Sequence, residues 1–214
     1  LTVPEAVRVM SSIFQDIRAC DVRQRAGQTQ YNAGEIRPSG IEAILRAVGP
    51  LHNGDVFLDV GAGIGNVLAQ VALTTNVRRC IGVDVWEELC VLAAKNIHRN
   101  ADAYPLLRKV SVVAAEVQNV LLSTQSPTAD ATIVYTNYFL FEESAKLYMA
   151  QKLSAMPNAR VVASTSRFCP RHRASCSQPF CSRWNFEREL KVACSWKSSL
   201  VSLYIYKSKS ISFL

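Results

Sequence analysis

The chain has 214 residues, of which 49% are hydrophobic, enough to build the core of one large domain. No uncharged apolar run approaches 18 residues, so the sequence predicts no membrane-spanning helix. The first 20 residues are interrupted by charged side chains and hold no apolar stretch long enough for a secretory signal. Together with seven cysteines, an odd number, this favours free thiols in a reducing compartment.

The net charge of +7 is concentrated in the last part of the chain. Residues 167–214 hold nine Lys and Arg against two Asp and Glu, whereas the charges of residues 1–166 cancel. A basic segment on a neutral body indicates an acidic partner, and nucleic acid is the commonest one. Solvated side chains on an ordinary face would give the same composition, so the charge alone leaves both interpretations open.

The N-terminal part predicts two helices separated by a loop. Four apolar residues recur at helical spacing within residues 4–25, namely Val7, Met10, Phe14 and Ile17. This pattern predicts an N-terminal helical segment over residues 1–26. The polar, glycine-bearing stretch that follows predicts a loop over residues 27–38. Ser39 is a suitable N-cap for a second helix, which Gly49 and Pro50 would end.

Strand-like and helix-like segments then alternate. The expected strands are residues 55–60, 79–84, 109–115, 130–137 and 159–165. The expected helices between them are residues 66–73, 86–100 and 142–155. Residues 168–185 are rich in Cys, Pro, Ser and Arg without periodicity, which predicts a long basic loop. Two consecutive strands, residues 186–196 and 198–207, are typical of a hairpin.

This alternation predicts an α/β fold, a parallel sheet with helices on both faces and an antiparallel hairpin at its end. Five parallel strands followed by such a pair are typical of the class I S-adenosylmethionine-dependent methyltransferases, with their seven-stranded Rossmann-like sheet. The sequence therefore predicts one methyltransferase domain over residues 27–214, with no internal repeat.

The segment VFLDVGAGIGN places Gly61, Gly63 and Gly65 between a strand and a helix. A dinucleotide site would need the third glycine one residue later, and the Gly-Lys-Ser/Thr of a P-loop is absent. Asp59 stands two residues before this turn, where it would repel a pyrophosphate and attract an ammonium. S-adenosylmethionine carries an ammonium and no phosphate, so the segment favours that cofactor. The alternative is a carboxylate that bonds only backbone amides of the turn.

Two more acids follow the next strands. Asp84 ends the second strand, 19 residues after Gly65, where an acid commonly accepts hydrogen bonds from ribose hydroxyls. Glu116 follows the third strand, where it could accept a bond from the adenine amino group. Because parallel strands end at one edge of a sheet, the three acids are expected to line one cleft.

The fourth strand ends in VYTNYFLF, residues 134–141, where the transferred methyl is expected. Methyltransferases that act on amino groups of bases or of glutamine usually carry Asn/Asp-Pro-Pro-Tyr/Phe here. This chain has Asn137 without the prolines. Core packing by the aromatic residues is the alternative interpretation.

Together these segments resemble the disruptor-of-telomeric-silencing family of non-SET histone lysine methyltransferases, over about residues 28–207. The family's Asp-Leu-Gly-Ser-Gly-x-Gly-Gln turn is matched by DVGAGIGN, and its Gly-Val-Glu by GVD. Its Phe-Val-Asn-Asn-Phe-Ala-Phe motif is matched by YTNYFLF, and its Ser-Trp-x3-Val-Ser-Tyr-Tyr segment by SWKSSLVSLY. Its Gly-Asp-Phe is matched by AEV, and the Gly-Glu of its cofactor-covering loop by the same pair in YNAGEI.

The resemblance implies S-adenosylmethionine as cofactor, a lysine of histone H3 in nucleosomes as substrate, a nuclear location and a monomer. Besides the three acids and three glycines, it implies cofactor contacts from Gly34, Glu35, Asn66, Val117 and Asn137. It also implies an aromatic lysine channel with Tyr135, Phe141 and Tyr204 as walls and Asn137 orienting the amine. An apolar channel favours the neutral amine needed for attack, although free lysine has a pKa of about 10.4.

Two departures leave other functions open. Val117 replaces a phenylalanine that covers adenine in the family, and Leu203 falls where the family has the first tyrosine of its lysine channel. Either Tyr204 or Tyr206 substitutes for that tyrosine, or the channel is more open. The alternatives are therefore a nucleic-acid amino-group methyltransferase, which the basic C-terminal part would suit, and a catalytically degenerate chromatin-binding module.

The basic loop contains four possible metal ligands, Cys169, His172, Cys176 and Cys181. Their spacings are irregular, without a Cys-x2-Cys pair, and the resemblance implies no zinc there, so the sequence predicts no metal site. Four arginines of this part of the chain are instead expected to contact nucleosomal DNA or an acidic histone surface. They are Arg167, Arg171, Arg173 and Arg183.

Overall fold

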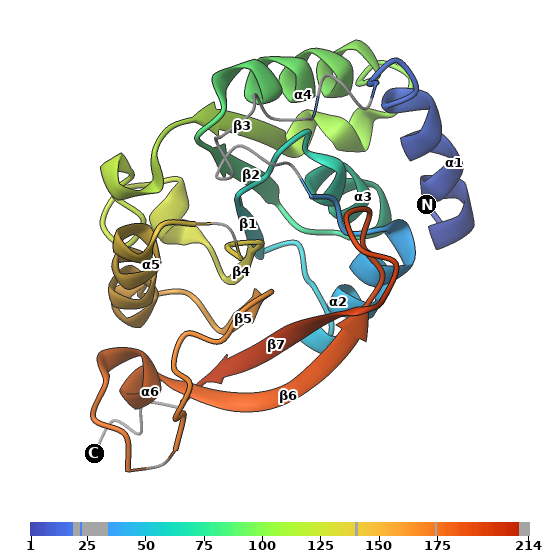
Figure 1. Ribbon diagram of the computed structural model, residues 1–214. Helices are drawn as coiled ribbons and strands as arrows, with labels where there is room; N and C mark the ends of the chain where they lie inside the picture. Colours follow the sequence, from blue (N-terminus) through green and yellow to red (C-terminus); the bar gives the residue numbers. More distant parts are fainter. Residues whose placement is uncertain (19–21, 23–33, 140, 174, 210–214) are drawn as a thin grey trace.

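The computed structural model describes residues 1–18, 22, 34–139, 141–173 and 175–209. Seven strands form one sheet in the order β3-β2-β1-β4-β5-β7-β6 (Figure 1). The first five are parallel, and β7 runs antiparallel to both β5 and β6. The strands are β1 Val56–Val60, β2 Arg79–Asp84, β3 Val110–Ala114, β4 Ile133–Thr136, β5 Val161–Ser164, β6 Trp184–Val192 and β7 Val201–Ser208.

Two helices precede the first strand, and the others follow strands, as the alternation predicted. The α-helices are α1 Val3–Ile13, α2 Pro38–Val48, α3 Asn66–Thr74, α4 Glu87–Arg99, α5 Glu143–Ala155 and α6 Pro179–Arg183. Short 3-10 helices are η2 Pro105–Lys109, η3 Val117–Asn119 and η4 Thr128–Asp130. The predicted class I methyltransferase sheet with its C-terminal hairpin is confirmed. In the described part of the chain, no helix is long and apolar enough to cross a membrane.

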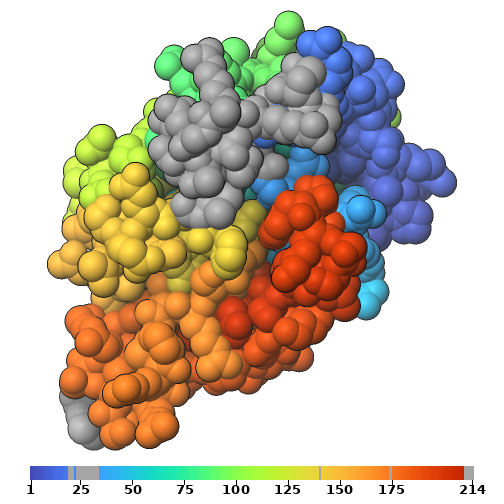
Figure 2. All heavy atoms as spheres, viewed as in Figure 1, coloured from blue at the N-terminus to red at the C-terminus, as the bar shows by residue number. Residues whose placement is uncertain are grey.

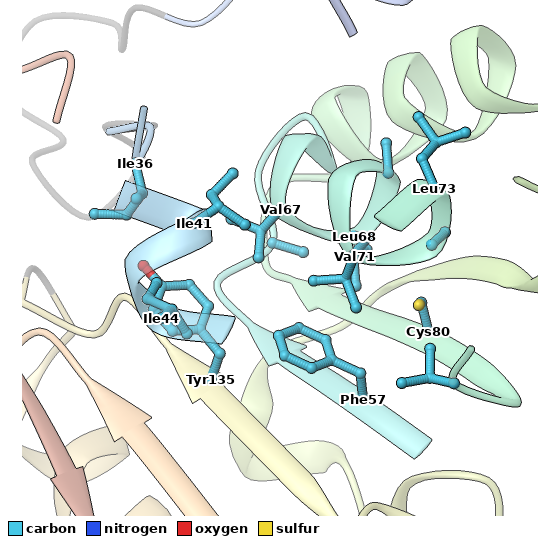
Figure 3. Packing of buried hydrophobic residues seen from close by; sticks show 14 of the residues in the cluster. Ile36, Ile41, Ile44, Phe57, Val67, Leu68, Val71, Leu73, Cys80 and Tyr135 are labelled. Carbon is cyan, nitrogen blue, oxygen red and sulfur yellow. The ribbon is translucent and has the colours of Figure 1, made fainter. Parts of the chain in front are cut away.

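Both faces of the sheet are buried. All five residues of β1 are buried, because successive side chains of a strand point to opposite faces and helices cover both. On one face, Phe57 and Tyr135 pack under α2 and α3 (Figure 3). On the other face, Leu58 and Val134 pack with residues of α5 such as Met149. The core therefore holds the carboxyl ends of the central strands in fixed positions.

The first helix is shorter than predicted, and of the four apolar residues in the predicted pattern only Met10 is buried. It ends at Ile13, and the predicted positions Val7, Phe14 and Ile17 are only half-buried. The residues buried from α1 are Ala6, Val9, Met10 and Ile13. Helical periodicity alone does not say which residues of α1 are covered, and the packing of α1 against α3 decides this. The predicted boundary between residues 26 and 27 lies outside the described residues and stays a prediction.

The N-terminus of α2 also differs from the prediction. Pro38 is its first residue and Arg37 its N-cap, so Ser39 lies inside the helix. Proline suits this position because its backbone torsion is already helical and it has no N–H to satisfy. The N-cap residue Arg37 is positioned by a distant part of the chain, since its backbone N–H donates to the carbonyl of Ala193.

The predicted loop over residues 168–185 is not entirely irregular. It contains the short helix α6, and β6 begins inside it at Trp184. The Trp184 side chain is fully buried, and its indole N–H donates to the carbonyl of Leu153 at 3.2 Å. Local periodicity cannot reveal this strand start, because it depends on packing against α5.

Candidate active site

A cavity of about 900 Å³ lies at the carboxyl ends of β1, β2, β3 and β4. The glycine turn after β1 forms one wall, and the residues that follow the other three strands form the rest. Segment 34–36 and residues 195–196 of the β6–β7 connection close another side. Parallel α/β sheets bind their ligands at this edge, so the cavity is the candidate active site.

Asp59 is the most unusual group in the cavity. It is 1% exposed, and neither carboxylate oxygen has a hydrogen-bond partner among the described residues. Burial, with a smaller contribution from the charge of Asp84, raises the pKa of Asp59 well above its ordinary value. A buried carboxylate without a partner is costly unless a ligand supplies a positive charge and donors. Asp59 therefore fits a cationic ligand group.

Tyr135 lies beside Asp59, since the two residues are register partners in β1 and β4. Its hydroxyl is also buried without a hydrogen-bond partner in the described part of the chain. Figure 3 shows its ring beside Ile44, with the hydroxyl directed toward Ile36. Tyr135 thus lines the cavity from the core side of the sheet, with most of its ring used in packing.

Asp84 shapes the glycine turn as well as lining the cavity. One of its oxygens accepts the backbone N–H of Gly63 at 2.7 Å, and the other accepts that of Trp86 at 2.9 Å. Burial raises the pKa of Asp84, and these backbone bonds act against the rise. The prediction placed Asp84 at ribose hydroxyls; the structure adds a role in holding the turn. Trp86, which the sequence did not suggest as a site residue, also lines the cavity.

Gly65 is the one member of the predicted glycine triplet that is not among the described lining residues. It is the N-cap of α3 in the left-handed region, with φ of 76°. A Cβ at this position would lie 3.1 Å from Ile97 Cδ1 of α4. Gly65 therefore serves helix packing and the turn, while Gly61 and Gly63 line the cavity.

The end of β3 contributes Glu116 and Val117 to the cavity. Val117 is 4% exposed and belongs to the core cluster under α5. This wall is therefore aliphatic where the resembled family has an aromatic ring. The backbone N–H of Ala115 donates to the carbonyl of Asp84, which ties the second and third strand ends together.

Segment 34–37 is fixed by the hairpin connection and by α3. The Glu35 backbone N–H donates to Ser195 Oγ, and its carbonyl accepts the Ser195 backbone N–H. On α3, the side-chain amide of Asn66 donates to the Ile36 carbonyl. That of Gln70 donates to the carbonyl of Pro38, the first residue of α2. Asn66 lines the cavity as predicted, but its donor group is used to position this segment. Burial raises the pKa of Glu35.

Gly34 lies between two residues that are far away in the chain. Its carbonyl accepts a hydrogen bond from Asn137 Nδ2 at 2.9 Å. A Cβ at Gly34 would lie 2.5 Å from the Trp196 ring, too close for any residue but glycine. The carbonyl of the Asn137 side chain accepts the Thr165 hydroxyl at 3.0 Å. Asn137 is thus held at both ends of its amide, with its orientation fixed at the cavity.

The aromatic walls differ from the prediction. Phe141 lines the cavity, 3.3 Å from where a Gly61 Cβ would be. Tyr204 is not among the described lining residues: its ring lies 5.1 Å from the guanidinium carbon of Arg167. Leu203 is fully buried in the core. The aromatic residue from the hairpin that lines the cavity is Trp196, which the matched SWKSSLVSLY segment contains but which was not expected to be a wall.

Comparison with known proteins identifies the family. Residues 15–207 match the family described as "Histone methylation protein DOT1". The chain belongs to the DOT1 family.

Two relatives are named "Histone-lysine N-methyltransferase, H3 lysine-79 specific". The Emericella nidulans protein is 31% identical over 96 residues, which are 44% of this chain and 19% of the relative. The Debaryomyces hansenii protein is 23% identical over 212 residues, which are 92% of this chain and 18% of the relative. This DOT1 chain therefore spans less than a fifth of the length of either relative.

The fold of this DOT1 chain is that of class I methyltransferases. A SAM-dependent methyltransferase from Aquifex aeolicus has a crystal structure that superposes with a TM-score of 0.54 at 17% identity. The match covers 93% of this chain and 97% of that one. At this identity the likeness establishes the shared fold.

The cavity of the DOT1 chain fits S-adenosylmethionine, the cofactor that its family uses. Asp59 offers the α-ammonium a buried carboxylate with no other partner among the described residues. Gly61 and Gly63 of the glycine turn line the cavity without side chains, and Asp84 lies at the next strand end. The predicted cofactor residues thus come together, apart from Gly65.

Proposed function

We propose that this chain is the catalytic domain of a histone lysine N-methyltransferase that transfers a methyl group from S-adenosylmethionine to a lysine of histone H3 in the nucleosome core. The observation that carries the proposal is the pairing, in one cavity, of an unpartnered buried carboxylate, Asp59, with an immobilised amide, Asn137. The family and the printed names of the two relatives supply the substrate class.

On this proposal, Asp59 binds the α-ammonium group of the cofactor, and the glycine turn lies against the part of the cofactor between that group and the ribose. S-adenosylmethionine, when bound, supplies a methyl group on a sulfonium that a nucleophile can displace. Asp84 would accept hydrogen bonds from the ribose while its own bonds to the turn keep the carboxylate in place. Binding and turn geometry are therefore coupled through this one side chain.

The residues around Asn137 would position and desolvate the substrate amine. Thr165 and Gly34 fix the amide, so it can orient an incoming group without reorganising. Phe141, Trp196 and Phe139 provide aromatic surface at the cavity. An apolar surrounding disfavours the ammonium form of lysine, whose pKa in water is about 10.4, and so supplies the neutral nucleophile. Positioning and exclusion of water then account for most of the rate enhancement.

Nucleosomal DNA is proposed as a second partner, and the nucleus as the location. Arg171 and Arg173 are exposed on the loop between β5 and β6, where phosphates could reach them. Arg183 suits this role less well, since its guanidinium donates to the Ala159 carbonyl and lies 5.8 Å from the Trp184 ring. The proposed DNA contacts therefore come mainly from the two exposed arginines.

The test compares three substrates under one set of conditions. The protein is incubated with labelled S-adenosylmethionine and with nucleosomes, free histones or RNA, and the labelled product is identified by mass spectrometry. Label on an H3 lysine, strongest with nucleosomes, is the expected result. Label on RNA bases would replace the proposal with a nucleic-acid methyltransferase, and cofactor binding without any label would indicate a degenerate module.

A further inference from the structure

The loop between β5 and β6 brings together four side chains whose spacing in the sequence did not predict a metal site. The sulfur atoms of Cys169, Cys176 and Cys181 all lie within 4.8 Å of one another. Cys169 Sγ is 3.8 Å from Cys176 Sγ, and Cys181 Sγ is 3.2 Å from His172 Nδ1. In Figures 1 and 2 this loop and α6 form a lobe at the lower left (orange), on the surface below α5.

The distances match a tetrahedral centre better than a disulfide. With zinc–sulfur bonds of about 2.3 Å, two thiolates of a tetrahedral site lie about 3.8 Å apart, whereas disulfide sulfurs lie about 2.0 Å apart. The separation of Cys169 and Cys176 equals the tetrahedral edge. The sulfur–nitrogen distance of Cys181 and His172 is shorter than the roughly 3.5 Å edge that zinc–sulfur and zinc–nitrogen bonds give, so the imidazole would shift slightly on coordination.

We propose that Cys169, His172, Cys176 and Cys181 bind one zinc ion. Three sulfurs and one imidazole nitrogen form the Cys3His set that prefers zinc, and four protein ligands leave no position for water or substrate. The site is therefore structural. It lies apart from the cavity, none of whose described lining residues is a member of this cluster.

The surroundings of the four ligands suit such an ion. The backbone of Trp184 acts to raise the pKa of the His172 ring, and that of Gln178 to lower the pKa of the Cys176 thiol, so both side chains have backbone polar groups beside them. Backbone polar groups of this kind orient ligands in metal sites. Lys209 donates to the carbonyl of Cys181 at 2.7 Å, which places a cation beside the ligands. That cation offsets the net negative charge of three thiolates around a divalent ion.

Packing explains why irregular ligand spacing still produces a cluster. The ring of Phe180 is 3% exposed and stacks on Phe168 at 4.4 Å, which places Cys181 beside Cys169. Phe168 in turn stacks on Tyr138 at 4.6 Å, and Tyr138 is the neighbour of Asn137 in the chain. A metal ion in the loop would therefore also stabilise the aromatic packing behind the candidate active site.

The experiment measures metal in the full chain purified without chelator. About one zinc per chain is expected by mass spectrometry of the metal, and Co(II) exchanged into the protein should give the absorption of tetrahedral thiolate ligation. His172→Ala and Cys181→Ser should lower the zinc content at least tenfold. Cys80→Ala, a buried thiol of β2, is the matched control and should keep the full zinc content.

Three outcomes would overturn the proposal. One is a wild-type protein that neither contains zinc nor gives the Co(II) spectrum after reduction and dialysis against the metal. Another is zinc content that stays unchanged in both ligand variants. The third is a mass two hydrogens lower for the untreated chain, with a mapped disulfide between two of the three cysteines. Because the Co(II) titration uses the wild-type chain, a variant that fails to fold does not remove the test.

Discussion

Asp59→Asn should make the cofactor-free protein more stable at neutral pH and at the same time abolish most of its cofactor affinity. The folded-state pKa of Asp59 is raised by burial first and by Asp84 second. A group whose pKa is raised by folding contributes stability below its unfolded pKa and loses that contribution as the pH rises through the folded pKa. At neutral pH and above, the buried carboxylate is therefore a destabilising group until a cation binds it.

The size of the effect follows from the two carboxylate oxygens, which have no hydrogen-bond partner in the described part of the chain. An unsatisfied buried polar group costs about 1–3 kcal/mol, and more when charged. Asparagine keeps the shape and leaves its own polar atoms unsatisfied, so it removes only the additional cost of the charge. The free energy of unfolding should therefore rise by about 1–3 kcal/mol at pH 8. For a chain of this length that is a rise in Tm of about 2–12 °C. Cofactor affinity should fall about 10- to 100-fold, because a charge-assisted bond is removed.

Thermal unfolding from pH 5 to pH 9, with and without S-adenosylhomocysteine, measures both effects. The variant should gain Tm over the wild type increasingly as the pH rises, and the ligand should raise Tm much less in the variant. Asp55→Asn is the control, because folding lowers the pKa of Asp55 whereas it raises that of Asp59. Burial acts to raise the pKa of Asp55, but hydrogen bonds from Arg160, His52 and Thr132 lower it overall. That variant should lose stability at neutral pH and keep its cofactor affinity.

The reasoning about Asp59 would be refuted by two results. One is a difference in Tm between variant and wild type that does not change with pH, since this would mean that the carboxyl does not titrate in the buried environment. The other is calorimetry that gives equal cofactor affinity for both proteins. A variant less stable than the wild type at pH 8 would likewise contradict the predicted sign of the effect.

Three further substitutions test the remaining parts of the site. Asn137→Ala should reduce single-turnover methylation of nucleosomes by about 100-fold or more while changing cofactor affinity much less, because the amide is pre-oriented for the reacting groups. Gly34→Ala should lower Tm and cofactor affinity, because the added Cβ would lie 2.5 Å from the facing tryptophan ring. Arg171→Ala with Arg173→Ala should weaken nucleosome binding and flatten its salt dependence, with the slope falling by about 0.9 for each phosphate that is no longer neutralised.

Each of these has a matched control. Asn158→Ala removes an amide that donates to the Ala129 carbonyl away from the cavity, and it should leave turnover intact. Gly54→Ala adds a Cβ with no described atom within 4 Å, so its Tm should not change. Arg108→Ala breaks an exposed ion pair with Asp102 and should keep the salt slope. Near-full methylation activity of Asn137→Ala would contradict the first prediction, and an unchanged Tm and cofactor affinity of Gly34→Ala the second. An unchanged salt slope for the double arginine variant would contradict the third.

Much of the fold could be predicted because it depends on local patterns. The strand expected at residues 79–84 coincides with β2, and the others differ by a few residues at their ends. Runs of buried apolar residues and glycine or proline boundaries are properties of neighbouring residues. The end of α1 at Ile13, the start of α2 at Pro38 and the start of β6 at Trp184 were wrong or missed, because contacts with distant segments decide them.

The sequence by itself determined that Asp59, Asp84 and Glu116 would share one cleft, because residues that follow parallel strands must meet at one edge of the sheet. It could not determine their partners. Only the tertiary structure decided that Asp84 holds the turn while Asp59 has no described partner. It also decided that Trp196 rather than Tyr204 lines the cavity, and that three irregularly spaced cysteines come together. Those contacts depend on how loops from different parts of the chain pack against each other, and spacing along the sequence carries no information about that packing.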